Sequence, residues 1–502
     1  MPQPDHIGRK TVVAAGWMVG WRMAARMLGF ISMLVLARLL VPADFGLVAM
    51  AAVFNGTIEA LSLLGVDSAL VRSEEVDDSL LNTAFTMEVM RALTNAAVVA
   101  LLSPVAGIWF GDPRLFPILL VLAANAAIGG FENIGIVSFR REMQFEKEFV
   151  IFLVPRLGGF VATLVLALLL RSYWALVAGI VLAQTLRVIL TYVIHPYRPR
   201  FSLARWRELT GFSFWMWVYA VGSFFGGQAD TLVLGRAFGP AVLGVYLTAL
   251  QIGTLPITEV TEPIRRALFS GFSAAQRRGM NPIANVISIA SVLLVGIVPA
   301  AIAISAASGP ITAVLLGPHW YAAQPLIAIF AWQCLFSVFS SVLAPAYVAR
   351  ADVRSNAMIC VLTAISRFAA MGAGAASGSL EVAAWASVGS RALEMMLYFI
   401  DLRGNPNFRI RLVIADSGRI LIAGVVSALV LYASGLAWRS SPASTLAGLR
   451  DGALIGALTV ASFAAAQIGL WLKAGCPAGP ESRVCSSFVT ITGPLRRMAW
   501  LR

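Results

Sequence analysis

The stretch LVLARLLVPADFG at residues 34–46 occurs a second time, as LVLGRAFGPAVLG, at residues 232–244. The two copies lie 198 residues apart and share seven of thirteen residues without a gap, where chance gives about one or two. The shared pairs are Leu34/Leu232, Val35/Val233, Leu36/Leu234, Arg38/Arg236, Pro42/Pro240, Ala43/Ala241 and Gly46/Gly244. Proline cannot continue a helix and glycine permits a tight turn, so each copy predicts a helix end.

Composition shows which environment these helices occupy. The 502 residues are 59% hydrophobic and 13% charged, whereas soluble domains contain about 25% charged residues. The segment 283–307 contains no charged residue at all. A run of this length matches a helix that crosses the hydrocarbon core of a bilayer, which is about 30 Å thick.

Similar apolar runs along the chain predict an all-α integral membrane protein with about fourteen transmembrane helices. The predicted spans are residues 12–40, 45–70, 80–110, 114–138, 149–170, 173–195, 210–237, 241–270, 284–307, 321–349, 354–377, 380–401, 419–438 and 452–473. The repeat relates the first span to the seventh, so both cross the membrane in the same direction. We therefore expect two parallel six-helix lobes, related by a pseudo-two-fold axis along the membrane normal, and two additional helices. The expected domains are residues 1–200, 201–411 and 412–473, with a cytoplasmic tail at 474–502.

The distribution of basic residues predicts the orientation of the chain. With the N-terminus inside, most of the 38 Lys and Arg residues fall in inner segments. The outer segments contain Arg38, Arg114, Arg171, Arg236, Arg439 and Arg450. Both termini are thus expected in the cytoplasm of a bacterial cell, with the spans in its inner membrane. The same asymmetry explains most of the +13 net charge, so a nucleic-acid partner is not needed to account for it.

Five arginines lie deep within predicted spans of the N-terminal lobe. Arg22 and Arg26 lie near the middle of the first span and share a helix face, because they are four residues apart. Arg91, Arg156 and Arg187 lie deep in later spans. A charge in the bilayer centre is costly and usually lines a cavity. The set predicts a cationic cavity for a phosphate or carboxylate group, whose oxygens guanidinium groups bind in pairs.

A structural alternative is that nearby acids neutralise these charges. Glu88 precedes Arg91 by three residues, and side chains at this spacing meet on a helix surface. Glu59 in the second span is a candidate partner for Arg22 or Arg26. Both interpretations, cavity lining and structural pairing, remain open from the sequence.

The C-terminal half also carries charges within predicted spans. Arg367 and Arg391 are its deep arginines, and Arg391 lies three residues before Glu394, with which it can pair. A buried carboxylate can take up a proton or a sodium ion and so couple transport to an ion gradient. Glu259 and Asp230 are the candidates for such coupling.

Motifs for catalysis, cofactors and metals were not found. The sequence has no phosphate-binding P-loop, no HExxH motif and no cysteine or histidine spacing typical of a metal site. It also lacks a nucleophile elbow, and its outer loops are short. We therefore predict a protein that is not an enzyme and that needs neither a cofactor nor a metal.

Four stretches resemble the polysaccharide-transporter branch of the MOP flippase superfamily. They are LVLARLLVPADFGLVAM, LVLGRAFGPAVLGVY, FRREMQFEKEF and LLGPHWYAAQPL. The resemblance extends over the whole chain. Within that branch, the sequence resembles particularly the Wzx-type exporters of bacterial exopolysaccharide and lipopolysaccharide clusters.

The resemblance implies a function in polysaccharide biosynthesis. Such proteins flip an oligosaccharide repeat unit, linked through pyrophosphate to the carrier undecaprenol, across the inner membrane. The polymerase and the chain-length regulator of the same pathway would be protein partners. The arginine-lined cavity of the family matches Arg22 and Arg26 by their position in the first span. The alternatives are a cation-coupled drug antiporter of the same superfamily, which the basic cavity disfavours, and a membrane polysaccharide polymerase or ligase.

Overall fold

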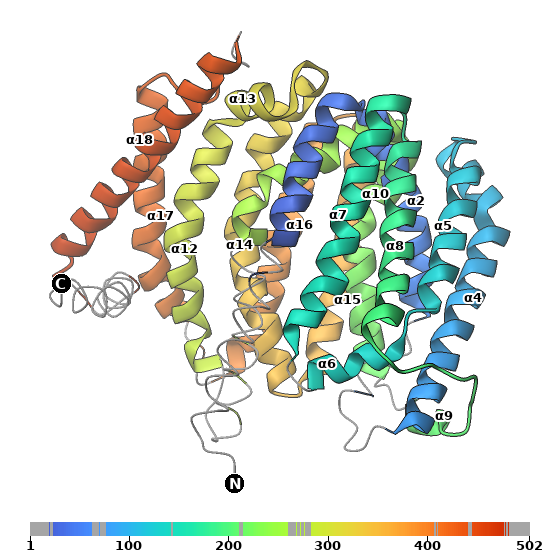
Figure 1. Ribbon diagram of the computed structural model, residues 1–502. Coiled ribbons are helices and arrows are strands. Elements are labelled where there is room, and N and C mark those ends of the chain that lie inside the picture. Colours follow the sequence, from blue (N-terminus) through green and yellow to red (C-terminus); the bar gives the residue numbers. More distant parts are fainter. Residues whose placement is uncertain are drawn as a thin grey trace, which may run out of the picture. The chain divides into compact units, whose positions relative to one another are not determined.

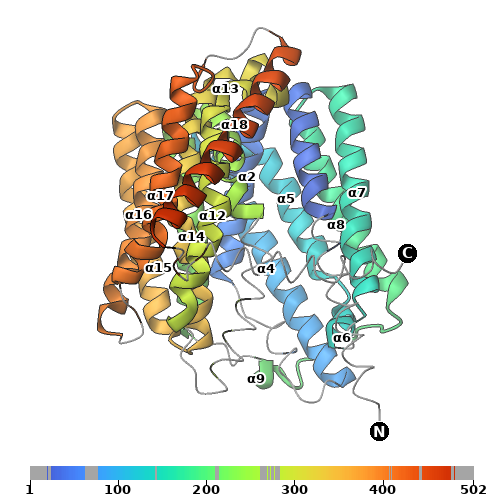
Figure 2. The ribbon, with the colours of Figure 1, turned by 90° about the vertical axis from the view of Figure 1, so that its left-hand side faces the viewer.

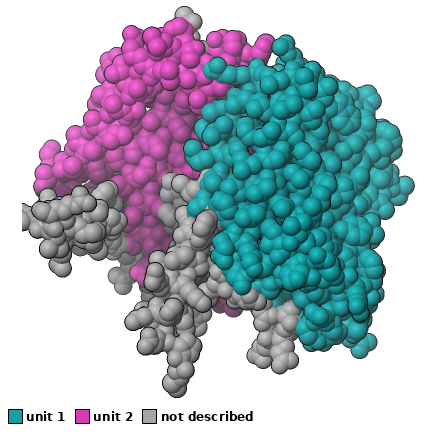
Figure 3. All heavy atoms as spheres, in the orientation of Figure 1, with its two compact units in different colours: residues 1–244 teal, residues 245–502 magenta. Residues whose placement is uncertain are grey.

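The computed structural model describes residues 24–62, 77–141, 144–209, 214–259, 283–405, 410–439 and 444–475, with a few isolated positions between them. Helices make up the secondary structure of these residues, which contain no β-strand (Figure 1). The predicted all-α fold is thereby confirmed. The chain forms two compact units, residues 1–244 and 245–502 (Figure 3).

Unit 1 begins, within the described residues, with a helix over residues 24–39. It continues with α2 (Pro42–Leu61), α4 (Asp78–Phe110), α5 (Leu115–Gly130), the 3-10 turn η1 (Ile134–Ile136), α6 (Val137–Arg141), α7 (Phe145–Leu170), α8 (Trp174–Ile194), α9 (Trp206–Leu209) and α10 (Phe214–Gly253). Helix α10 continues into unit 2. The helix pairs α4/α5 and α7/α8 pack along their lengths, and α5 joins them by packing on α8 (Figure 1).

Unit 2 is built around α12 (Ile283–Ala306). The other elements are α13 (Ser308–Ile311), the π-helical η2 (Thr312–Leu316), the 3-10 segment η3 (Pro318–Ala323), α14 (Gln324–Ala349), α15 (Val353–Ala376), α16 (Leu380–Asp401), the 3-10 turn η4 (Leu402–Gly404), α17 (Ile410–Ala433) and α18 (Thr445–Lys473). Helix α12 packs against α14 and against α17 (Figure 2). Ile420 of α17 and Ile455 of α18 are fully buried in the same core as α12. The two helices that follow the predicted repeat therefore share the core of this unit.

The helices have the length and composition that a bilayer requires. In the described part of the chain, nine helices are long and apolar enough to cross a membrane. Two apolar helices, Leu115–Gly130 and Ser417–Ala433, are shorter. Each of the fourteen predicted spans contains helical residues. The number fourteen itself stays a prediction, as do the domain boundaries that were derived from the repeat.

Both copies of the repeated stretch end a helix at the same place. In the first copy, Val41 has extended backbone angles (φ −92°, ψ 158°) and Pro42 begins α2. In the second, Gly239 (φ 78°, ψ −180°) interrupts α10 immediately before Pro240. Only glycine adopts the angles of Gly239 without strain. The proline in each copy thus begins a new helix, for which its fixed φ is suited.

The two copies also contact each other within unit 1. A Cβ atom added to Gly46 would overlap the carbonyl oxygen of Pro240, and one added to Gly244 would overlap the carbonyl oxygen of Pro42. We call this arrangement of Pro42, Gly46, Pro240 and Gly244 the glycine clasp. The backbones approach so closely that only glycine fits at these two positions, each next to the proline of the other copy.

Candidate functional site

The predicted cavity arginines that the structure describes come from four different elements of unit 1. Arg26 lies on the helix over residues 24–39, Arg91 on α4, Arg156 on α7 and Arg187 on α8. Arg22 lies outside the described residues. Arg26 is half-buried and interacts with its surroundings.

Arg91 forms the ion pair that its sequence spacing allows. Its Nε and Nη2 atoms donate to Oε2 of Glu88 at 2.9 and 2.6 Å. The two side chains are 19% and 23% exposed, so the pair is largely sheltered. Because the pair is neutral as a unit, it lowers the cost of placing Arg91 in a low-dielectric environment.

Arg187 is paired with an acid that the sequence analysis missed. Its Nη2 and Nε atoms donate to Oε1 of Glu132 at 2.9 and 3.2 Å. Its guanidinium group also lies over the ring of Phe152, 4.6 Å from the ring centroid. Glu132 follows α5 and is 55 residues away in the sequence, so no local pattern indicates the contact. The Arg187 side chain remains 34% exposed, which leaves part of the guanidinium group accessible.

Arg156 differs from the other arginines in its surroundings. It is exposed on α7, and its side chain makes no hydrogen bond or ion pair with the described residues. An exposed guanidinium group presents its donors to whatever lies next to α7. Of the four arginines that the structure describes, Arg156 therefore has the most hydrogen-bond donors available.

The two acids proposed for ion coupling lie in contrasting environments. Asp230 on α10 is 1% exposed and interacts with its surroundings. Glu259, at the end of a helical turn over residues 255–259, is exposed. Among the described residues, no group of three or more His, Cys, Asp or Glu side chains could hold a metal ion.

Unit 2 contains a buried polar network around Arg367. The Arg367 side chain is 2% exposed, and its Nη2 donates to Oγ of Ser387 at 3.0 Å. Ser387 in turn donates to Oε1 of Gln333 at 3.2 Å. The network joins α14, α15 and α16. Arg391 pairs with Glu394 at 2.7 Å, as their spacing predicts.

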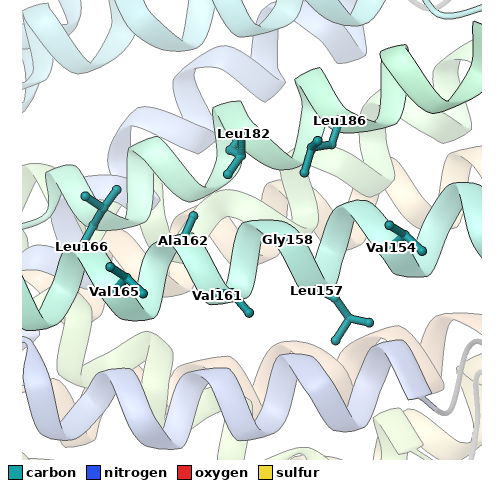
Figure 4. A pocket seen from close by; sticks show the side chains of 9 residues that line it. All are labelled: Val154, Leu157, Gly158, Val161, Ala162, Val165, Leu166, Leu182 and Leu186. Atoms are coloured by element: carbon teal, nitrogen blue, oxygen red, sulfur yellow. The ribbon is translucent and has the colours of Figure 1, made fainter.

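An open apolar groove of about 690 Å³ runs between α7 and α8 (Figure 4). It is lined by Val154, Leu157, Gly158, Val161, Ala162, Val165, Leu166, Leu182 and Leu186. Small residues let the two helices approach closely beside the groove. A Cβ atom on Gly159 would meet the Cβ of Ala183 at 2.8 Å. With no polar side chain in its lining, the groove suits a hydrocarbon chain and not a sugar or a phosphate.

Comparison with solved structures defines the fold. The chain matches a structure of the lipid II flippase MurJ in an inward closed conformation with a TM-score of 0.68, covering 89% of this chain and 98% of that one, at 12% identity. It matches an inward-facing MATE multidrug resistance transporter of the MOP superfamily with a TM-score of 0.58, covering 77% of this chain and 94% of that one, at 14% identity. The protein is a multi-pass membrane protein with the fold of these two structures.

The family follows from the sequence itself. A family model described as "Polysaccharide biosynthesis protein" matches residues 35–325, more than half of the chain, and the chain belongs to this family. It is 25% identical to the succinoglycan biosynthesis transport protein ExoT of Rhizobium meliloti (strain 1021), over 65% of this chain and 66% of that protein. It is also 25% identical to the lipopolysaccharide biosynthesis protein WzxC of Escherichia coli (strain K12), over 66% of this chain and 68% of that protein. The chain thus spans about two thirds of the length of the relatives it matches.

Proposed function

We propose that this protein flips oligosaccharide repeat units, linked through pyrophosphate to undecaprenol, from the cytoplasmic to the periplasmic leaflet of the bacterial inner membrane. The units would supply the synthesis of an extracellular polysaccharide or a lipopolysaccharide. The observation that carries the proposal is the family match over residues 35–325. The names of the relatives, which refer to succinoglycan transport and to lipopolysaccharide and teichuronic acid biosynthesis, support it.

The charges of unit 1 fit the anionic part of such a cargo. Arg156 and the accessible part of Arg187 offer donors on adjacent helices, α7 and α8. Arg22 and Arg26 of the first predicted span would add further donors. A pyrophosphate group carries several oxygens that guanidinium groups bind in bidentate fashion. In this proposal the arginines bind the pyrophosphate, while the polyprenyl tail stays on an apolar surface such as the groove between α7 and α8.

Deletion of the gene, followed by mass spectrometry of the membrane lipids, tests the proposal. We expect a complete lipid-linked repeat unit to accumulate and extracellular polymer to be lost. Both effects should be reversed when the gene is restored on a plasmid. Unchanged lipid intermediates together with normal polymer, in a strain with no second flippase of this family, would contradict the proposal.

A cation-coupled antiporter is the second candidate, and one observation favours it. Asp230 is a carboxylate buried to 1% exposure, as a proton- or sodium-binding residue should be. In that case the deletion strain should become sensitive to cationic drugs, and D230N should fail to restore resistance. A membrane polymerase or ligase has less support, because ExoT is named as a transport protein.

A further inference from the structure

The connection between α8 and α9 is fastened to the first turns of α4. Asn82 accepts two hydrogen bonds through Oδ1, from the hydroxyl of Tyr197 and from the backbone N–H of Arg200, both at 2.6 Å. The backbone N–H of Ser202 donates to Oγ1 of Thr86 at 2.8 Å. These bonds hold the backbone of residues 197–202 against α4. The side chains on its other side are therefore presented outward in a fixed arrangement.

The length of α4 places this connection at the depth of lipid headgroups. Helix α4 has 33 residues and is about 50 Å long at about 1.5 Å per residue. The hydrocarbon core is about 30 Å thick, and about 40–45 Å with both headgroup layers. Thr86 lies about 36 Å and Asn82 about 42 Å from the end of α4 at Phe110. With that end at the outer boundary of the hydrocarbon, Thr86 lies in the opposite headgroup layer and Asn82 lies a few ångströms beyond it.

The outward side chains of the connection are aromatic, aliphatic and cationic. Phe201, Leu203 and Trp206 are 69%, 46% and 48% exposed. Arg200 and Arg207 are exposed beside them. The guanidinium group of Arg207 lies over the ring of Trp206, 5.7 Å from its centroid.

The charges of the connection are only partly balanced by acids. Arg205 bonds to both Asp77 and Glu208 at 2.6 Å, so these three groups together carry one negative charge, against the two positive charges of Arg198 and Arg200. Arg200 makes no side-chain hydrogen bond or ion pair with the described residues. Arg198 donates to the backbone carbonyls of His195 and Tyr197, which have no formal charge. The surface therefore keeps an excess of positive charge.

We propose that residues 198–207, the linker surface, bind the phosphodiester headgroups of anionic phospholipids. Arg198, Arg200 and Arg207 contact the phosphates, while Phe201 and Trp206 lie among the headgroups. Aromatic and basic side chains occupy these positions in membrane proteins because each matches the polarity of its layer. The ligand is a resident lipid and not the cargo, so the inference goes beyond the proposed flippase function. The predicted orientation of the chain assigns this surface to the cytoplasmic leaflet.

A lipid titration of the full-length protein in detergent tests the proposal. Dioctanoyl phosphatidylglycerol is added to the wild type and to R200Q/R207Q, and its apparent affinity is taken from the rise of the thermal unfolding midpoint. We expect roughly 30-fold weaker binding in the double variant, since each arginine near an anionic lipid surface contributes about 1 kcal/mol. The control R171Q removes an exposed arginine of the α7–α8 turn and should bind as the wild type does.

Two further measurements keep the test decisive. If R200Q/R207Q does not fold, the wild type is titrated at low and high salt, and high salt should abolish the preference for phosphatidylglycerol over phosphatidylcholine. Equal binding of the two lipids by the wild type would overturn the proposal. Displacement of the lipid by inorganic pyrophosphate would overturn it as well, because the surface would then be a site for the cargo headgroup.

Discussion

Gly46 and Gly244 show how a single missing methyl group determines a contact between distant parts of the chain. In the glycine clasp, the Cα atoms approach the carbonyl groups of Pro42 and Pro240 so closely that no Cβ atom fits. The obstacle on both sides is backbone, which cannot rotate away as a side chain can. A substitution must therefore push the two helix starts apart.

We predict that G46A destabilises the protein by about 2 kcal/mol, as over-packing typically does. The measurement is the thermal unfolding midpoint of the purified protein in detergent. The matched control is G29A, because a Cβ atom at Gly29 meets nothing within 4 Å. Alanine there should stabilise the helix by up to about 1 kcal/mol, since glycine is a poor helix former. Equal effects of the two substitutions would mean that the clasp tolerates a side chain.

Asp112 determines the behaviour of the α4–α5 turn at low pH. It accepts hydrogen bonds from Nη2 of Arg114 at 2.7 Å and from the backbone N–H of Arg114 at 3.0 Å. The side-chain hydrogen bonds of Arg114 lower the pKa of Asp112, although partial burial opposes them. The folded state therefore favours the carboxylate more than the unfolded state does.

A lowered pKa has a defined consequence for stability. The contribution of Asp112 is complete above its ordinary pKa of about 4 and is lost as the pH falls through the lowered value. We expect wild type and D112N to converge in thermal midpoint below that range and to differ at neutral pH. A constant difference between them over the whole pH range would show that the contact with Arg114 does not depend on the charge.

At the scale of elements, Asp44 links the start of α2 to the turn between α7 and α8. One carboxylate oxygen accepts from the backbone N–H of Val41 and the other from that of Tyr173, both at 3.2 Å. The first bond satisfies a backbone donor at the helix start. The second joins segments 129 residues apart.

We predict that D44A lowers stability by about 2 kcal/mol, because two N–H groups lose a charged acceptor. D44N should cost less, since its amide oxygen can still accept one of the bonds. D78N serves as the control, because Asp77 and not Asp78 accepts the capping bond from Leu80 at the start of α4. Chemical or thermal unfolding in detergent gives the order expected, and a D78N effect as large as that of D44A would contradict it.

The helices themselves were predictable because they depend on local sequence. The predicted spans 354–377 and 380–401 correspond to Val353–Ala376 and Leu380–Asp401. A long apolar run and the glycines and polar residues that end it are sufficient for such agreement. The predicted break between spans 210–237 and 241–270 is confirmed, because Gly239 interrupts α10 at that place.

The surroundings of the candidate site residues were predictable only where partners lie on one helix. The pair of Glu88 and Arg91 follows from a spacing of three residues. Glu132 reaches Arg187 only because α5 packs on α8, and this packing has no signature in the local sequence. The roles assigned to Arg22, Arg26, Arg91, Arg156 and Arg187 in binding, and to Glu259 and Asp230 in coupling, stay predictions.

At the scale of the whole molecule, substitution of single arginines can test the proposed transport separately from folding. We predict that R26A, and likewise R22A, abolishes polysaccharide export while the protein remains folded and abundant in the membrane. Binding of the pyrophosphate would lose a charged donor, which typically costs about 2–5 kcal/mol for a buried charge pair. Export by the deletion strain that carries each variant is compared with export in the presence of R171Q. Normal export with R26A and R22A would exclude both residues from cargo binding.

The contacts of the glycine clasp are reciprocal, as contacts around a two-fold axis are. The glycine of the first copy meets the proline of the second, and the glycine of the second meets the proline of the first. In an association of two identical chains, one such patch serves both partners, so a single change appears on both sides at once. The clasp thus has, within one polypeptide, the form of a homodimer interface.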